Sequence, residues 1–219
     1  MKYPYLLFDL DGTVIDSGEG VKKSVLYALK RFGIPPIAWD KLDPFLGPPL
    51  PYSFHNFAGV PEEKCAQAVA FYREYYRDQK GMLMYRVYEG MPEALKELQN
   101  AGYKLALATS KPQPFAEQLM EREGLKACFA AIVGSDLEEK TRAKKCDVIR
   151  ACLEELGAIK DQALMIGDRS YDILGAKEVG IASLGVSFGY GSREELIECG
   201  ADMIADSVEE LKTRFLQDA

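Results

Sequence analysis

The chain has 219 residues, and its 34 acidic and 27 basic side chains give a net charge of −7. A chain of this length can bury a sizeable core, and 47% hydrophobic with 28% charged residues is typical of a folded protein rather than a disordered one. The acidic balance argues against a partner such as polymeric nucleic acid, whose binders normally present a basic surface. It does not exclude a small anionic substrate, because a bound metal ion can reverse the local field.

Cysteine usage and hydropathy predict the cellular compartment of the protein. The five cysteines are widely spaced without a CxxC pair, which favours free thiols in a reducing compartment. The amino-terminal segment has only a short apolar run before Asp9 and does not resemble a signal peptide. The longest uncharged stretch, residues 44–61, contains five prolines and cannot form a membrane helix. We therefore expect a cytoplasmic protein without a membrane partner.

Histidine is nearly absent, which limits the catalytic mechanisms and metal sites that the chain can form. His55 is the only one, so a histidine-rich zinc site is excluded and a Ser-His-Asp triad would depend on this residue. It lies in the proline-rich stretch, where a loop or packing role is expected. Any catalysis should therefore depend mainly on carboxylates, hydroxyls and lysine.

The first part of the chain predicts one strand followed by helices. The apolar run 5–9 is typical of a buried strand, and Gly12 follows it as a turn residue. From Gly18 the hydrophobic period becomes helical over 18–32, prolines interrupt the chain over 35–61, and a helical pattern returns over 62–79. No buried strand is expected between Gly18 and about Tyr85. We therefore predict that a helical cap, residues 17–85, interrupts a core formed by residues 1–16 and 86–219.

The second part of the chain alternates regularly between helices and strands, and a glycine follows each of the first four helices. This alternation is typical of an α/β fold with a doubly wound, Rossmann-like parallel sheet. Two capping boxes, Ser192-x-x-Glu195 and Ser207-x-x-Glu210, predict two further short helices. The predicted helices are 91–101, 113–123, 144–156 and 171–179, and the predicted strands are 103–108, 131–133, 163–166 and 181–186.

Polar residues follow several of the predicted strands. In a doubly wound sheet, ligands bind beyond the carboxyl ends of the strands, so side chains at these ends are candidates for chemistry. Four carboxylates at one edge would repel one another, and the usual remedy is a hard cation with oxygen ligands, here most simply Mg²⁺. Each aspartate taken alone could equally be a turn residue or a helix cap. The four are Asp9, Asp11, Asp168 and Asp172.

Hydroxyl and lysine side chains complete a candidate phosphate site. Thr109 and Ser110 end a predicted strand where a helix begins, and a hydroxyl with free backbone N–H groups can hold a phosphate there. A lysine would balance the phosphoryl charge. The candidates are Lys140, which precedes the predicted helix 144–156, and Lys144 and Lys145 at its start, although each could also be a solvated surface residue.

Three short motifs together resemble a known family. They are Asp9-Leu10-Asp11-Gly12-Thr13-Val14, Leu105-Ala106-Leu107-Ala108-Thr109 and Gly167-Asp168-Arg169-Ser170-Tyr171-Asp172. In this order, with the helical insert between the first and second, they resemble the haloacid dehalogenase-like hydrolase superfamily over essentially the whole chain. The chain is most similar to the phosphoglycolate phosphatase-like branch, which includes bacterial 5′-nucleotidases. The segment 47–50, Gly-Pro-Pro-Leu, is similar to one in the nucleotidase-like group.

The resemblance implies a role for each motif residue. Asp9 would be the nucleophile that forms an aspartyl-phosphate, and Asp11 the general acid and base. Mg²⁺ would be held by the Asp9 side chain, the backbone carbonyl of Asp11 and Asp168. Thr109, Ser110 and Lys145 would bind the phosphoryl group, with Lys145 preferred to Lys144 because of its place just before the helix's apolar face. Asp172 would support the metal site or the lysine.

The implied activity is Mg²⁺-dependent hydrolysis of a small phosphorylated metabolite, phosphoglycolate or a nucleoside 5′-monophosphate, whose identity depends on the cap. A β-phosphoglucomutase-like phosphoryl transfer to a sugar would use the same groups and remains an alternative. A receiver domain that carries a phosphorylated aspartate is a further alternative, although such domains are about half as long and lack the early insert. The expected oligomeric state is a monomer or a weak homodimer.

Overall fold

The computed structural model describes residues 1–137 and 141–217. The chain divides into two compact units, one formed by residues 1–14 and 87–219 and the other by residues 15–86. The short strands β2 (Ile15–Asp16) and β3 (Arg86–Val87), which form a two-stranded sheet, lie where the chain passes from one unit to the other.

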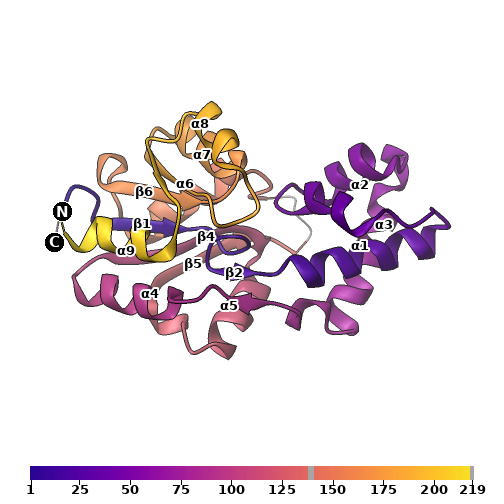
Figure 1. Ribbon diagram of the computed structural model, residues 1–219, viewed down its shortest axis with the longest axis horizontal. Helices are drawn as coiled ribbons and strands as arrows, with labels where there is room; N and C mark the ends of the chain where they lie inside the picture. The colour runs from indigo at the N-terminus through magenta and orange to yellow at the C-terminus, as the bar shows by residue number, and fades with distance from the viewer. Residues whose placement is uncertain (138–140, 218–219) are drawn as a thin grey trace. The chain divides into compact units, whose positions relative to one another are not determined.

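The larger unit is built on a six-stranded sheet of order β5-β4-β1-β6-β7-β8, in which every pairing is parallel (Figure 1). This confirms the predicted doubly wound α/β class. The first strand is central because its residues Leu6, Leu7 and Phe8 have no exposed surface and need neighbours on both sides. The strands are β1 (Tyr5–Phe8), β4 (Lys104–Pro112), β5 (Phe129–Ser135), β6 (Ala163–Gly167), β7 (Ala182–Val186) and β8 (Met203–Ala205).

Helices cover both faces of this sheet. In Figure 1, α4 (Met91–Asn100) and α5 (Gln113–Arg122) lie on one face, and α6 (Lys145–Leu156) and α7 (Ser170–Val179) lie on the other. Apolar residues of α6 and α7 pack on the sheet through a buried cluster. Its members include Leu7, Ala106, Val133, Val148, Cys152, Met165 and Ala176. The last two helices, α8 (Arg193–Glu198) and α9 (Val208–Leu216), begin after Ser192 and Ser207, as the capping residues predicted.

Two features of the sheet differ from the sequence-based expectation. Strand β8 was not predicted, because three residues at a sheet edge are too few to show a period. Strand β4 was expected to end at residue 108 but continues to Pro112, with a register shift against β5 between Ala108 and Pro112. Thr109 and Ser110 therefore lie within an irregular strand end, and α5 begins only at Gln113.

The smaller unit contains helices and short helical turns. Its main helices are α1 (Gly18–Phe32), α2 (Leu50–Ala58) and α3 (Cys65–Arg73). The prolines of residues 44–61 were expected to interrupt the chain, yet α2 lies among them because Pro51 occupies its first turn, where no backbone N–H is needed. The helix predicted over 62–79 is divided into a 3₁₀ turn, α3 and a π-helical turn over Glu74–Asp78.

The residues with an expected structural role have local partners. The Nδ1 atom of His55 lies 3.0 Å from the carbonyl oxygen of Val60, at the end of α2. All five cysteines are free, and four of them are buried. Among the helices of the part of the chain that the structure describes, none is both long and apolar enough to cross a membrane.

Candidate active site

The candidate site lies at the carboxyl ends of the central strands. The chain adds strands outward from β1 to β4 and β5, then returns to the other side of β1 for β6, β7 and β8. Such a reversal of direction leaves a crevice at the strand ends, where ligands bind in doubly wound folds. Phe8 is level with Leu107 on one side and Ile166 on the other. The residues that follow these three strands therefore meet at one edge.

A buried lysine connects the first and last motifs. The Nζ atom of Lys145 lies 2.8 Å from Oδ1 of Asp9, 2.8 Å from Oδ1 of Asp172 and 3.1 Å from the carbonyl oxygen of Ala108. Its side chain is only 4% exposed because Lys145 is the first residue of α6 and faces the sheet. Lys144 is exposed, and Lys140 lies outside the described residues. Lys145 is thus the lysine that contacts the candidate nucleophile.

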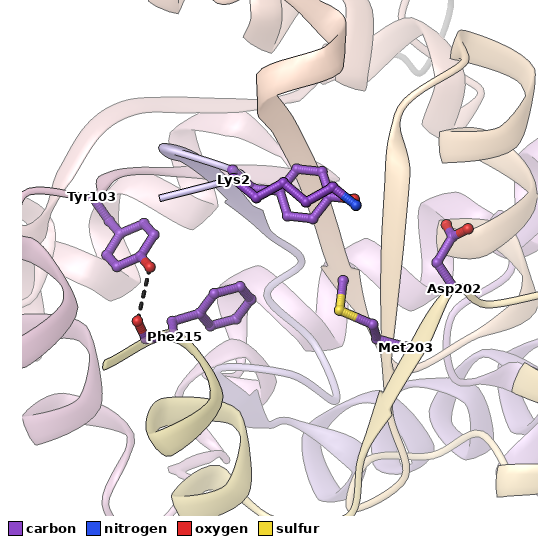
Figure 2. Close-up of a pocket in the computed structure, with 6 residues that line it drawn as sticks. Lys2, Tyr103, Asp202, Met203 and Phe215 are labelled. Carbon is purple, nitrogen blue, oxygen red and sulfur yellow. Dashed lines mark hydrogen bonds between the residues drawn. The ribbon is translucent and has the colours of Figure 1, made fainter. Parts of the chain in front are cut away.

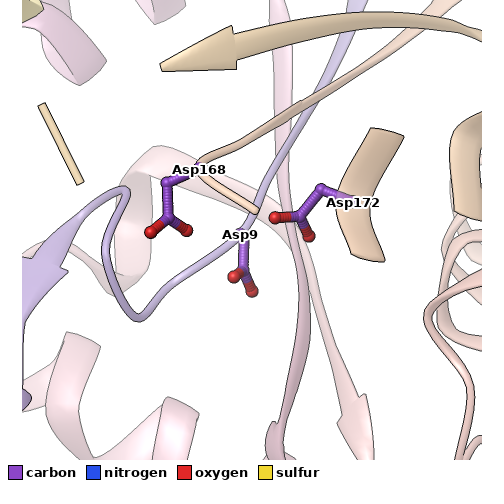
Figure 3. A group of neighbouring side chains, drawn as sticks. All are labelled: Asp9, Asp168 and Asp172. Carbon is purple, nitrogen blue, oxygen red and sulfur yellow. The ribbon is translucent and has the colours of Figure 1, made fainter. Parts of the chain in front are cut away.

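Three carboxylates converge at the same edge (Figure 3). Oxygen atoms of Asp9, Asp168 and Asp172 all lie within 4.8 Å of one another. Asp168 and Asp172 are essentially inaccessible to solvent, and Asp9 is 9% exposed. The backbone N–H of Tyr190 donates to Oδ2 of Asp168 at 2.7 Å, whereas the buried Oδ1 has no hydrogen-bond partner in the described part of the chain. One carboxylate oxygen therefore remains available in a buried acidic cluster.

Burial and mutual repulsion shift the ionisation of this cluster. Burial raises the pKa of Asp9 to about 6, although the charge of Lys145 opposes this effect. Burial, and then the charges of Asp172 and Asp9, raise the pKa of Asp168 well above its ordinary value. Burial alone would lower the pKa of Lys145, but the charges of Asp172 and Asp9 reverse this and raise it. Lys145 therefore stays charged, and the acidic cluster favours additional positive charge.

Two glycines allow the loops around Asp168 to approach closely. Gly12, with φ of +85°, makes the turn after β1, and a Cβ there would overlap the carboxylate of Asp168. Gly189 lies in the loop after β7, and a Cβ there would overlap both the carbonyl oxygen of Gly12 and Asp168. This contact holds the loop near Asp168, to which the neighbouring Tyr190 donates its N–H.

The remaining predicted residues lie around β4. Asp11 is half-buried, and its Oδ2 forms an ion pair with Nζ of Lys111 at 2.9 Å. Thr109 is buried, and its hydroxyl oxygen accepts a hydrogen bond from the backbone N–H of Lys111 at 3.1 Å. Ser110 is half-buried, and its carbonyl oxygen accepts from the hydroxyl of Ser135. The structure thus joins Asp9, Asp172 and Lys145 directly and places Asp11 in a separate ion pair.

Sequence reasoning missed three contributors to this region. Lys111 was not among the predicted site residues, and the contribution of Tyr190 is a backbone N–H, which no side-chain pattern can predict. Glu195 was interpreted as half of a capping box, but its Oε1 accepts from the N–H of Ser170 at 2.8 Å and from Nε of Arg169 at 3.1 Å. Glu195 therefore stabilises the turn between Asp168 and Asp172 through these two contacts.

A separate cavity of about 370 Å³ lies at the opposite, amino-terminal edge of the sheet (Figure 2). Tyr103, just before β4, donates its hydroxyl to the carbonyl oxygen of Phe215 at 2.9 Å on its wall. The cavity contains none of the residues predicted for the site. Its lining residues are Lys2, Tyr3, Tyr103, Asp202, Met203 and Phe215.

The fold and the site together define the class of protein: a doubly wound α/β protein in which carboxylates and buried lysines cluster at the carboxyl ends of the central strands. Residues 6–186 match the family model described as haloacid dehalogenase-like hydrolase. The chain belongs to this family, as its motifs indicated, and the family excludes the receiver-domain alternative.

Several proteins are similar to this chain over most of their length. A 5′-nucleotidase of Pseudomonas aeruginosa is 42% identical over 196 residues, which cover 90% of this chain and 88% of the relative. The tyrosine-protein kinase PtkA of Mycobacterium tuberculosis is 32% identical over 94% of this chain and 70% of the relative. Among solved structures, a predicted phosphatase from Clostridium acetobutylicum has a TM-score of 0.94 at 44% identity, covering 99% of this chain and 100% of that one.

Proposed function

We propose that this protein is a Mg²⁺-dependent phosphatase that hydrolyses a small phosphate monoester through an aspartyl-phosphate on Asp9. The observation that carries the proposal is the buried group of Asp9, Lys145, Asp172 and Asp168 at the carboxyl ends of β1 and β6. An aspartate beside a fixed lysine can attack phosphorus, because the ammonium group balances negative charge brought by the phosphoryl group.

In the first step, a carboxylate oxygen of Asp9 forms a bond to phosphorus while the bond to the ester oxygen breaks, and Asp11 donates a proton to that oxygen. In the second step, Asp11 removes a proton from water, whose oxygen attacks phosphorus and releases inorganic phosphate from Asp9. Lys145 holds Asp9 in place. The Thr109 hydroxyl accepts a hydrogen bond from the Lys111 backbone and can still donate its own hydrogen to a phosphoryl oxygen.

The donor set fits Mg²⁺. Magnesium prefers oxygen ligands, and the unpartnered Oδ1 of Asp168 supplies a buried one close to Asp9. Asp9, Asp168 and the backbone carbonyl of Asp11 would hold the ion, whereas Asp172 is engaged by Lys145 and by the N–H of Arg169 at 3.1 Å. When bound, the ion neutralises charge on the phosphoryl oxygens and orients them.

Gly189 provides a test of the metal site. In Gly189→Ala, the added methyl group would push the loop away from Asp168, and we expect Mg²⁺ affinity to fall about 10–100-fold. Isothermal titration calorimetry with Mg²⁺ measures this without turnover. Gly124→Ala is the control, because Gly124 has φ of +66° and open space around it. That variant should lose roughly 1 kcal/mol of stability and keep its Mg²⁺ affinity. Unchanged affinity in Gly189→Ala would contradict the assignment.

For the substrate class, we infer a nucleoside 5′-monophosphate or phosphoglycolate, with residues 17–85 acting as the cap that selects it. The similarity to a 5′-nucleotidase over 90% of the chain supports the first of these. The test is release of inorganic phosphate in the presence of Mg²⁺ from a panel of nucleoside 5′-monophosphates, phosphoglycolate and sugar phosphates. We expect kcat/KM for one nucleoside monophosphate to exceed that for every sugar phosphate. The absence of release from all these esters would overturn the proposal.

A second candidate is transfer of the phosphoryl group to an acceptor other than water. The similarity to a protein named tyrosine-protein kinase supports it, and a β-phosphoglucomutase-like transfer would proceed through the same intermediate. The phosphate assay separates these reactions when a hydroxyl acceptor is added. A transferase yields a phosphorylated acceptor and proportionately less inorganic phosphate, whereas a phosphatase yields an unchanged amount.

A further inference from the structure

Lys111 is a buried cation whose partner belongs to the candidate catalytic machinery. Its side chain is 5% exposed, and its Nζ lies 2.9 Å from Oδ2 of Asp11, which is itself 21% exposed. A buried ammonium group carries a substantial desolvation cost and is retained where its charge is compensated. The ion pair is therefore a fixed feature of the site, unlike the exposed pairs elsewhere on the surface.

The end of β4 directs Lys111 toward the site. Between Ala108 and Pro112 the strand shifts register against β5, and such irregularities re-aim side chains near active sites. The backbone N–H of Lys111 donates to the Thr109 hydroxyl at 3.1 Å. The same residue thus fixes the hydroxyl expected to contact the phosphoryl group and the carboxylate expected to move the proton.

We propose that Lys111 is a positioning residue that holds the carboxylate of Asp11 in the orientation needed for proton transfer. This inference rests on the proposed function. Asp11 lies three residues after β1, beside Gly12, whose φ of +85° makes the turn, and a partner on a neighbouring strand would keep its side chain in one orientation. Lys111 provides that partner from the neighbouring strand, because β1 and β4 are paired in parallel. Lys145 positions the carboxylate of Asp9 in the same way, through their ion pair.

A double-mutant cycle tests whether Lys111 acts through Asp11. Lys111→Met keeps the length of the side chain and removes its charge. In the otherwise wild-type protein we expect kcat for a nucleoside 5′-monophosphate to fall about 10²-fold, with the inhibition constant of inorganic phosphate unchanged. In the Asp11→Asn background, where no carboxylate remains to be positioned, the same substitution should change kcat by no more than about twofold.

The dependence of the rate on the leaving group is a second readout, and a purely structural role of Lys111 would not change it. An alkoxide leaving group needs a proton, whereas p-nitrophenolate does not, so Lys111→Met should impair hydrolysis of p-nitrophenyl phosphate far less than that of the nucleotide. Lys104→Met is the matched control, because Lys104 is an exposed lysine at the other end of β4. Its rates should equal those of the wild type on both substrates.

Each alternative outcome contradicts the role of Lys111. Equal losses in both backgrounds would mean that Lys111 acts independently of Asp11, and a weaker inhibition by phosphate would mean that it binds the phosphoryl group directly. An unchanged rate in Lys111→Met would mean that it has no role. If Lys111→Met does not fold, Lys111→Arg, which keeps the charge and alters its position, takes its place in the cycle with the same criteria. A wild-type protein that hydrolyses neither ester would instead overturn the proposed function, and the role of Lys111 with it.

Discussion

Replacing Asp9 with Asn is expected to reduce turnover to background while the protein remains folded. The amide is a poor nucleophile toward phosphorus, so no phosphoryl-enzyme can form. Lys145 would keep its ion pair with Asp172 at 2.8 Å and its hydrogen bond to Ala108, which is why we expect the fold to survive. Intact-mass spectrometry of quenched reactions and thermal unfolding measure the two effects.

The matched variant Asp11→Asn should behave differently. It retains the nucleophile and the backbone carbonyl, and loses only proton transfer, which contributes a factor of about 10²–10⁴ to the reaction rate. Residual turnover should be highest on an aryl phosphate, and phosphoryl-enzyme should accumulate because its hydrolysis also needs the base. A phosphoryl mass on Asp9→Asn, or equal residual rates of the two variants on an aryl phosphate, would contradict the assigned roles.

Removal of divalent metal is expected to abolish activity as completely as the loss of Asp9. Burial, together with nearby like charges, raises the pKa of both Asp9 and Asp168, so we expect the site to need a further cation to hold negative phosphoryl oxygens. Excess chelator should stop phosphate release, and added Mg²⁺ should restore it.

Calcium should inhibit rather than restore. It accepts more ligands at longer distances, which would disturb the alignment of Asp9 with phosphorus. Steady-state rates in chelator with Mg²⁺ or Ca²⁺ added back give the comparison. Full activity in excess chelator would show that Lys145 and the backbone suffice, and would contradict the metal site.

The part of the site that could be predicted from the sequence is the part carried by side chains in short motifs. Asp9 and Asp168 follow apolar strands, and the parallel order of these strands requires their ends to meet. The preference for Lys145 over Lys144 came from the family resemblance, together with its place just before the apolar face of a helix. The hydrophobic pattern around these residues indicates whether each lies at the end of a strand or at the start of a helix. The same pattern made the fold class predictable.

The remainder depends on contacts between distant segments. Lys111 meets Asp11 because β4 is irregular near its end, and no local pattern encodes that register shift. Glu195 satisfied a capping pattern, yet only Ser192 acts as the cap, and the glutamate carboxylate instead binds the turn at Ser170. The backbone N–H groups of Ser192 and Ser170 are alternative donors to this one carboxylate, and only the folded geometry determines which of them it accepts from.

The central position of β1 has a consequence for how the chain is synthesised. Phe8 pairs with Leu107 and Ile166, so this apolar segment leaves the ribosome long before either of its neighbours in the sheet. Contacts between such distant residues are slow to form, because a long loop must be closed before they stabilise anything. While residues 15–86 are being made, the nascent strand and the proposed nucleophile Asp9 remain without a sheet. Until Ile166 has emerged, Leu6, Leu7 and Phe8 lack the strand on one side of β1, and exposed apolar segments of this kind are prone to aggregate.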